Sequence, residues 1–369
     1  MSLYPGQDGE SALAQGTAGT LYIADRGVVE KFKNFKNIPA PLRSAIEADN
    51  RLLVSSVDIT DILRAVPRAM NVEKLVGVGG GTALDFAKCL RTVAGDAALA
   101  NYLARTKRSD VLFLKDNASP WRLELYATTL GTGAEASTSC SVRNSHGSLL
   151  LLKSTQFIPD TGERLLSLTD HLSRQAVVEA CVEVLFRTIG TLPECAPSSR
   201  DEDNIAIAAE VLDLIHATES RVLDRTEKER LCDIGARTHE PMFVDAPSPF
   251  VGKAWYLGRE LQQLSQLSKV QALVHSWLKL HEFYAEGPWV PENARAIELV
   301  TRALYSSSLV SVARAPIAML LYLAERLGVS RFSLREDART VYERAIRENW
   351  VELRQVFEPA ASRSIAMRT

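Results

Sequence analysis

The chain divides into two parts with different patterns of hydrophobic positions. Up to about residue 155, short apolar runs alternate with segments of helical periodicity. This alternation is typical of a parallel sheet whose strands are connected by crossover helices. The strands that the pattern predicts are residues 21–23, 52–54, 75–78, 111–114 and 123–127.

After residue 159, apolar residues recur at spacings of three and four, which predicts amphipathic helices. The clearest segments are residues 176–188, 204–216, 261–284 and 294–309. A length of 369 residues with 46% hydrophobic residues suits two folded domains. We therefore expect an α/β domain over residues 1–158 and an all-helical domain over residues 159–369.

Composition narrows the classes of partner. The chain has 43 Lys and Arg against 45 Asp and Glu, so it has no strong positive field for a nucleic acid. No run of about 18 apolar residues predicts a membrane span. The five cysteines include no CxxC pair, which argues against a disulfide framework or a thiolate metal site. We expect a cytoplasmic protein that acts on a small molecule or a peptide.

A glycine-rich turn follows the third predicted strand. In KLVGVGGGTALDFAKCL, Gly79, Gly80 and Gly81 stand between an apolar strand and a helix that begins near Thr82. Glycine allows the backbone to approach a ligand, and the N–H groups at the start of the helix favour a pyrophosphate. A tight strand-to-helix turn without a ligand is the alternative for one isolated motif.

Two motifs in this order resemble those of a known family. GGGTALDFAK is similar to the GGGSxxDxAK motif of the iron-containing alcohol dehydrogenases, which are related to dehydroquinate synthase, and Asp85 and Lys88 stand at matching positions. YATTLGTGAEAS resembles the family's PTTxGTGSEVT segment, with Ala127 and Ala134 at its proline and serine positions. The resemblance implies a dehydroquinate synthase-like fold, in which a Rossmann-like dinucleotide-binding domain precedes an all-α domain. It also implies an active site between the domains and a homo-oligomer.

The resemblance further implies that NAD is the cofactor. Asp25, at the end of the first strand, matches an acidic residue that in this family meets the adenosine ribose and disfavours a 2′-phosphate. A helix N-cap is the other interpretation of Asp25, and both roles can coexist. The cofactor-binding residues implied in this way are Asp25, Gly79, Gly80, Gly81, Thr82, Asp85, Lys88, Thr128, Thr129, Gly131 and Thr132.

The metal ligands of the family have no counterparts here. Relatives hold a divalent ion with an Asp and a His at D-x3-H spacing on the first helix of the second domain, and with further histidines downstream. Alignment places Gln175 and Glu179 at the first pair and Trp255, Arg259 and Lys269 at the histidine positions. Trp, Arg and Lys cannot ligate a divalent cation. We therefore expect no metal site, and we expect the remaining histidines to be ordinary core or surface residues.

Positive side chains could take over part of the role of the metal. Lys269, if desolvated beside Arg259, would have a lowered pKa and could act as a base, while Arg259 holds an anionic group of the substrate. Glu179 would be the counter-charge or an alternative base. The competing interpretation is that these three charges lie on solvated helix faces.

These observations favour a metal-independent, NAD-dependent oxidoreductase that acts on a hydroxyl or carbonyl group. In its divergence the chain also resembles the dehydrogenase-type enzymes of daptide pathways, which modify the C-terminal threonine of a ribosomally made peptide. Two alternatives stay open. One is a catalytically degenerate NAD-binding scaffold or regulator, and the other is a lyase-type relative of the sugar-phosphate cyclases.

Overall fold

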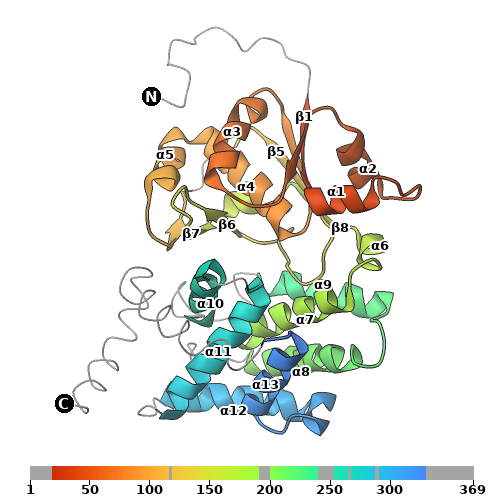
Figure 1. Ribbon diagram of the computed structural model, residues 1–369, viewed down its shortest axis with the longest axis vertical. Helices are drawn as coiled ribbons and strands as arrows, with labels where there is room; N and C mark the ends of the chain where they lie inside the picture. The colour runs from red at the N-terminus through yellow and green to blue at the C-terminus, as the bar shows by residue number, and fades with distance from the viewer. Residues whose placement is uncertain are drawn as a thin grey trace, which may run out of the picture. The chain divides into compact units, whose positions relative to one another are not determined.

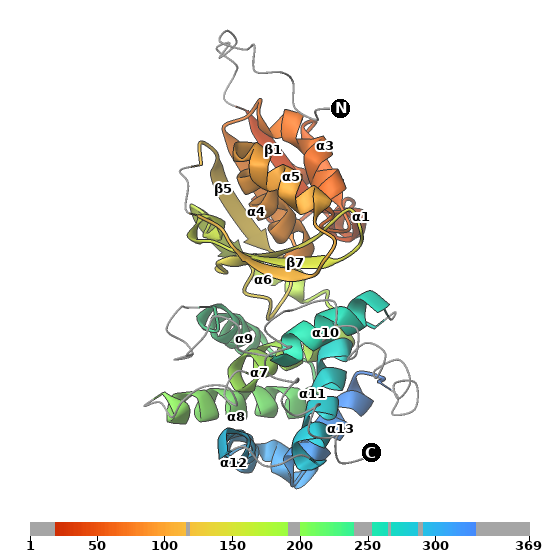
Figure 2. The same ribbon diagram turned by 90° about the vertical axis from the view of Figure 1, so that its left-hand side faces the viewer.

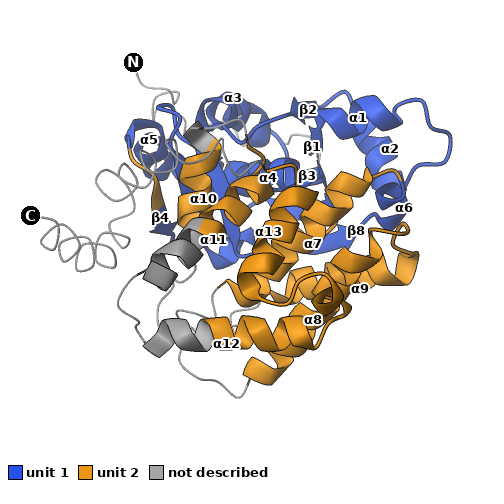
Figure 3. Ribbon diagram, turned by 60° about the horizontal axis from the view of Figure 1, so that its bottom comes forward, with its two compact units in different colours: residues 1–107, 111–129, 134–170 blue, residues 108–110, 130–133, 171–369 orange. Residues whose placement is uncertain are grey.

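The computed structural model describes residues 19–115, 119–190, 200–239, 253–264, 267–286 and 291–329, without the side chains of 253–254, 263–264, 279–286 and 291–296. These residues form two compact units (Figure 3). Unit 1 comprises the described residues up to Lys107 together with Val111–Thr129 and Ala134–Asp170, and unit 2 comprises Arg108–Asp110, Leu130–Gly133 and the described residues from His171 onward. Unit 1 thus extends beyond residue 158, where the sequence pattern placed the boundary.

Unit 1 is built on a five-stranded parallel sheet with the order β2-β1-β3-β5-β8 (Figure 1). Its strands are β1 (Thr20–Asp25), β2 (Arg51–Val54), β3 (Lys74–Gly79), β5 (Arg122–Ala127) and β8 (Thr161–Arg164). The register aligns Ala24 with Val78 and Val78 with Tyr126, so the carboxyl ends of β1, β3 and β5 meet at one edge of the sheet. Four of the five predicted strands are confirmed in this sheet.

Alternate residues of each strand face opposite sides of this sheet, as strand geometry requires. Leu21, Ile23 and Leu75 belong to one core with α3 (Ile59–Ala69), α4 (Gly81–Gly95) and α5 (Ala97–Arg105). Ala24 and Val78 belong to the other core with α1 (Arg26–Phe32), α2 (Ala40–Glu47) and α6 (Leu166–Thr169). Unit 1 is therefore a three-layer α/β/α structure, in agreement with the predicted fold class.

The fourth predicted strand forms, but it does not join the parallel sheet. It is β4 (Asp110–Phe113), which belongs to a separate three-stranded sheet with the order β4-β7-β6. In that sheet β6 (Ser139–Arg143) and β7 (Leu149–Lys153) form an antiparallel pair that the sequence analysis missed. The expectation that residues 111–114 pair within the parallel sheet was therefore wrong, because the hydrophobicity of a run does not determine its pairing partner.

Unit 2 is helical in its described parts. It contains α7 (Arg174–Ile189), α8 (Asp201–Ala217), α9 (Arg225–Arg237), α10 (Lys253–Leu264), α11 (Lys269–Glu286), α12 (Pro291–Tyr305), the short η3 (Ser308–Ser311) and α13 (Pro316–Arg326). Figures 1 and 2 show α7 beside α8 and α10 beside α11. None of these described helices is long and apolar enough to cross a lipid bilayer.

The segment 261–284, predicted as one helix, contains the end of α10 and most of α11. Ser268 starts the second helix, because its hydroxyl accepts a hydrogen bond from the Gln271 N–H at 3.2 Å. The Gln271 side chain in turn accepts one from the Ser268 N–H at 2.8 Å. This reciprocal pair is a capping box, and the Ser-x-x-Gln pattern was the sequence signal for it.

Candidate functional site

The glycine-rich turn lies at the edge where the parallel strands of unit 1 end. A Cβ on Gly79 would lie 2.6 Å from the Cβ of Asp25 and 2.8 Å from that of Ala83, so a side chain there would displace its neighbours. Helix α4 begins at Gly81, and its N-cap residue Gly80 provides no side-chain cap. The N–H groups of the first turn, which includes Thr82, are therefore suited to an anionic ligand.

Two threonines stand beside this turn. The N–H of Thr128 donates to the carbonyl of Gly79 at 2.9 Å, and Thr129 Cγ2 lies 3.2 Å from the position of a Cβ on Gly80. The hydroxyl oxygens of Thr128 and Thr129 are both buried and lack a hydrogen-bond partner within the described structure. Each such buried hydroxyl costs about 1–3 kcal/mol. A ligand with polar oxygens at the turn would supply the missing partners.

Asp25 has the N-cap role that was one of its two interpretations. Its Oδ1 accepts a hydrogen bond from the N–H of Val28 at 3.1 Å, which caps α1. The same residue packs against Gly79 at the end of β1. The cap uses one carboxylate oxygen, so the other can accept a hydroxyl hydrogen bond from a ligand. The contact with a ribose stays a prediction.

Asp85 and Lys88 connect α4 to the segment that follows the threonine motif. The Lys88 side chain is fully buried, and its ammonium donates to the carbonyls of Ser137 and Ser139 at 3.0 and 3.3 Å. Asp85 Oδ2 accepts a hydrogen bond from the N–H of Ser141 at 3.0 Å. Both residues therefore position the two sequence motifs relative to each other, and their direct contact with a cofactor stays a prediction.

The second half of the threonine motif, Leu130–Gly133, belongs to unit 2. Gly131 has a φ of +74°, and a Cβ there would lie 2.6 Å from the carbonyl oxygen of Ala180 on α7. The carbonyl oxygen of Thr132 lies 2.9 Å from Nε2 of His239, which follows α9. His239, expected to be an ordinary residue, thus contacts a predicted site segment. The threonine motif contributes Thr128 and Thr129 to unit 1, and Gly131 and Thr132 to unit 2.

A group of charged side chains gathers in unit 2. The ammonium of Lys269 lies 2.8 Å from Oε1 of Glu183, and the guanidinium of Arg187 bonds to the same oxygen. Arg187 also donates to the carbonyl of Gly131 at 2.8 Å. Lys269 and Arg187 lie over the ring of Trp255, at 5.4 and 5.9 Å from its centroid. We call Glu183, Arg187, Trp255, Arg259 and Lys269 the Glu183 cluster.

Electrostatics in this cluster explain its protonation states. Burial acts to raise the pKa of Glu183, but the adjacent Lys269 and Arg187 outweigh it and lower the pKa to about 2. The pKa of Lys269 is lowered, first by desolvation of its ammonium and then by Arg187 and Arg259, although Glu183 acts in the opposite direction. The cluster thus holds one carboxylate among three cations. The Lys269 side chain is 39% exposed, so it is partly solvated while its ammonium is paired with Glu183.

The counter-charge of Lys269 is Glu183 and not Glu179, which the alignment had suggested. Glu179 lies one turn earlier on α7, and its described hydrogen bond comes from Gln175 at 3.4 Å. The two glutamates share a helix face because they are four residues apart. The missed signal was the Glu183 and Arg187 pair, two charges at i,i+4 spacing in the mainly apolar second half of α7.

The structure groups no three His, Cys, Asp or Glu side chains into a metal site within the residues it describes. The cysteines in the described part of the chain form no disulfide, and all of them are buried: Cys89, Cys140, Cys181 and Cys232. Of the predicted cation pair, Arg259 acts on Lys269, and Lys269 lies over the ring of Trp255, which the alignment assigns to another histidine position of the family.

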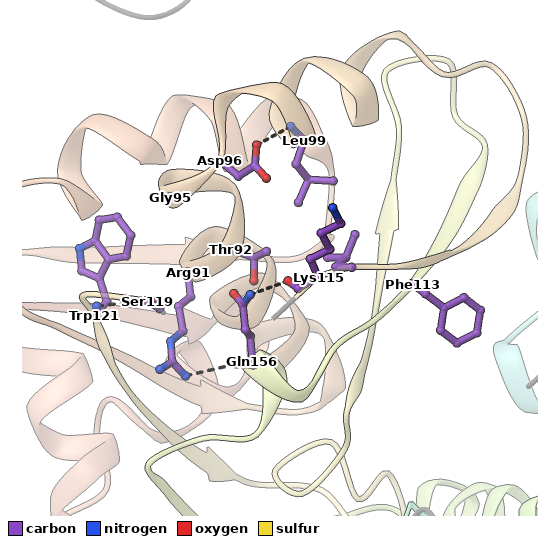
Figure 4. A pocket seen from close by; sticks show the side chains of 11 residues that line it. Arg91, Thr92, Gly95, Asp96, Leu99, Phe113, Lys115, Ser119, Trp121 and Gln156 are labelled. Atoms are coloured by element: carbon purple, nitrogen blue, oxygen red, sulfur yellow. Dashed lines mark hydrogen bonds between the residues drawn. The ribbon is translucent and has the colours of Figure 1, made fainter. Parts of the chain in front are cut away.

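Unit 1 also contains a cavity of about 220 Å³ on the far end of α4 from the glycine turn (Figure 4). Its polar walls bond to one another: Gln156 donates to the carbonyl of Lys115 at 2.8 Å and accepts from Arg91 at 3.2 Å. None of the predicted site residues lines it. The lining residues are Arg91, Thr92, Gly95, Asp96, Leu99, Phe113, Leu114, Lys115, Ser119, Trp121 and Gln156.

Solved structures with the same fold include three oxidoreductases. A sulfoacetaldehyde reductase from Bifidobacterium kashiwanohense in complex with NAD+ is 15% identical, with a TM-score of 0.65 over 90% of this chain and 85% of that chain. An iron-containing alcohol dehydrogenase from Thermotoga maritima is 16% identical, with a TM-score of 0.63 over 89% and 86%. One from Thermococcus thioreducens is 14% identical, with a TM-score of 0.63 over 88% and 84%. At these identities the likeness shows the fold.

Residues 9–162 match the family model described as iron-containing alcohol dehydrogenase. This matched segment, which is less than half of the chain, contains both the glycine-rich turn and the threonine motif, and it is similar to the iron-containing alcohol dehydrogenases. The resemblance noted in the sequence is thereby confirmed, and so is the dehydroquinate synthase-like fold. A search of curated protein sequences found no match.

Proposed function

We propose that the protein is an NAD-dependent oxidoreductase that oxidises a hydroxyl group or reduces the corresponding carbonyl. The observation that carries the proposal is the pair of buried hydroxyls of Thr128 and Thr129, which lack partners and lie beside the uncapped start of α4. A pyrophosphate bound there would meet the helix N–H groups and satisfy these hydroxyls. The carboxylate of Asp25 at the same edge would accept the ribose hydroxyls of NAD and repel a 2′-phosphate.

Bound NAD would supply the hydride acceptor for the carbon that bears the hydroxyl. The chain's own contribution is to hold the dinucleotide with residues 79–82 and the threonine motif, and to manage the hydroxyl proton. Lys269 is the group we assign to that proton, because its ammonium has a lowered pKa and lies among other cations. The same positive potential stabilises an alkoxide.

Metal independence is part of this proposal. It is supported by the alignment of Gln175, Glu179, Trp255, Arg259 and Lys269 with the family's ligand positions, since of these five only Glu179 has a side chain that usually binds a divalent cation. The cations of the Glu183 cluster provide positive charge within unit 2, which a metal ion provides in the relatives. Arg187 is the additional cation that the sequence analysis did not include.

The substrate that fits this cluster carries an anionic group near its hydroxyl. Arg259 adds positive charge beside Lys269, and it is the group we assign to a substrate carboxylate because a guanidinium can bind a carboxylate through two hydrogen bonds. The C-terminal threonine of a ribosomally made peptide, as in daptide pathways, has both groups. Oxidation gives a β-keto acid. The bond between its α-carbon and its carboxylate then breaks: carbon dioxide leaves, and the electron pair forms an enolate that takes up a proton to give a ketone.

Three measurements on one purified sample test the proposal. Metal content is determined by mass spectrometry, NAD binding by quenching of tryptophan fluorescence, and turnover by NADH absorbance with a threonine-ending peptide in the presence of a chelator. Binding of NAD and turnover without stoichiometric metal are the expected results. Stoichiometric zinc or iron would overturn metal independence. Binding of NAD without turnover of any hydroxyl substrate would instead favour the degenerate scaffold.

A further inference from the structure

We infer that Glu183 is a positioning residue that holds the Lys269 ammonium and, through Arg187, the Gly131 end of the threonine motif in one arrangement. The inference takes from the proposed function only the assignment of Lys269 to proton exchange. Glu183 itself is expected to touch neither substrate nor cofactor.

The geometry at Glu183 shows how one carboxylate can organise two cations. Its Oε1 accepts from Lys269 at 2.8 Å and also from Arg187, and its side chain is only 8% exposed. Charge-assisted hydrogen bonds of this kind are stronger and shorter than neutral ones. Without the carboxylate, Lys269 and Arg187 would be two like charges that share the face of Trp255.

Arg187 extends this arrangement to the threonine motif. While one end of its guanidinium bonds to Glu183, Nη1 donates to the carbonyl of Gly131 at 2.8 Å. Gly131 also lies so close to the carbonyl of Ala180 that no side chain fits between them. Ala180 and Arg187, which are about two turns apart on α7, therefore fix the backbone of Gly131. Thr128 and Thr129 precede Gly131 in the same motif by three and two residues.

Within the described residues, the charges that act on this pair come from unit 2. The charges that act on Lys269 are those of Glu183 and Arg187 on α7 and of Arg259 on α10. His239, beyond the end of α9, also acts on the charge of Glu183. Removal of the carboxylate leaves cations as the described charges around Lys269, which disfavours its protonated form. Removal of Arg187 has the opposite effect, since one repelling cation disappears.

The test measures the titration of Lys269 directly. Lysines are reductively methylated with ¹³C-formaldehyde, the Lys269 signal is assigned by its loss in Lys269→Arg, and its chemical shift is followed against pH. Glu183→Gln should lower the pKa of Lys269 by about 1–3 units, as expected for the loss of an opposite charge at close range. Glu183→Asp should restore part of the shift. Arg187→Gln should raise the pKa of Lys269. This variant keeps the inference testable if Glu183→Gln fails to fold.

The control is Glu210→Gln, the same change at an exposed glutamate of α8 that bonds to Arg230. Its Lys269 titration should match that of the wild type. An unchanged Lys269 titration in Glu183→Gln, or an equal shift in the control, would overturn the inference. Because the titration needs no substrate, an inactive protein with the expected shift would contradict the proposed function while supporting the role of Glu183.

Discussion

The ammonium of Lys269 is held 2.8 Å from Oε1 of Glu183, a carboxylate inside unit 2. The lysine is the first residue of α11, and the glutamate lies two turns into α7, so two separate helices determine the contact. A lysine in such a place is neither a freely solvated charge nor an ordinary ion pair, because Arg187 and Arg259 also act on it. Its protonation can therefore respond to its neighbours.

Two substitutions of Lys269 should show whether turnover depends on its positive charge or on its ability to exchange a proton. Lys269→Met should lower turnover by about 100-fold or more, the usual contribution of a general acid or base. Lys269→Arg keeps the positive charge but cannot exchange a proton near neutral pH, so it should be nearly as inactive. Steady-state turnover and fluorescence titration with NAD check this, and NAD binding should change less than about 3-fold in both variants. Wild-type turnover in Lys269→Met would remove Lys269 from the reaction.

The hydroxyls of Thr128 and Thr129 should stabilise the complex with NAD more than they stabilise the protein without NAD. Valine has the shape of threonine without the hydroxyl, so Thr128→Val and Thr129→Val remove oxygens that have no partner in the structure. We expect each variant to be as stable as the wild type or slightly more stable, yet to bind NAD about 3- to 10-fold more weakly. Thermal unfolding and NAD titration measure the two effects.

The matched control for these threonines is Thr92→Val on α4. The hydroxyl of Thr92 is buried but donates to the carbonyl of Lys88 at 3.2 Å, so its removal should destabilise the protein slightly and leave NAD binding unchanged. If Thr128→Val and Thr129→Val bind NAD as the wild type does, their hydroxyls do not contact the dinucleotide, and the proposed cofactor site loses its main support.

Local patterns in the sequence were sufficient to predict the glycine turn and four of the five strands of the parallel sheet, but not its edge strand β8. Strand, glycines and helix are contiguous between residues 74 and 95, so their chemistry can be read from adjacent positions. Pairing is different, because it depends on residues far apart in the chain. The antiparallel β6–β7 pair and the transfer of β4 to its sheet therefore could not be derived from periodicity alone.

The unit 2 site was predicted only in part for the same reason. Alignment placed Arg259 and Lys269 at the former ligand positions, and the structure brings them together. It also selected Glu179, because an alignment to a D-x3-H pattern cannot distinguish neighbouring turns of one helix face. The contact between Glu183 and Lys269 joins residues 86 positions apart, which no spacing rule could reveal.

A side chain at Gly80 should interfere with binding without disrupting the fold. Gly80 has a φ of −77°, which any residue adopts, so the effect is steric. A Cβ would lie 3.2 Å from Thr129 Cγ2 and beside the N–H groups of α4. Gly80→Ala should weaken NAD binding, and Gly80→Val should abolish it at millimolar NAD, as measured by fluorescence titration.

Gly95→Ala at the other end of α4 is the control and should bind NAD normally. Its Cβ would lie 3.5 Å from the ring of Trp121. Equal binding by all three variants would exclude the turn as the pyrophosphate site.

Acid should remove the stabilisation that comes from Glu183. The pKa of this carboxyl is about 2 in the folded protein against an ordinary value of 4.5, so its ionised form stabilises the fold at pH values above about 4.5. This contribution is lost as the pH falls from about 4.5 to about 2, and it amounts to about 3 kcal/mol when fully present.

The variant Glu183→Gln lacks the titrating group. The difference in free energy of unfolding between wild type and variant should therefore shrink by about 3 kcal/mol over this range. Urea unfolding curves at several pH values, followed by tryptophan fluorescence, measure it. A difference that stays constant from pH 6 to pH 2 would show that Glu183 is not held ionised by Lys269 and Arg187.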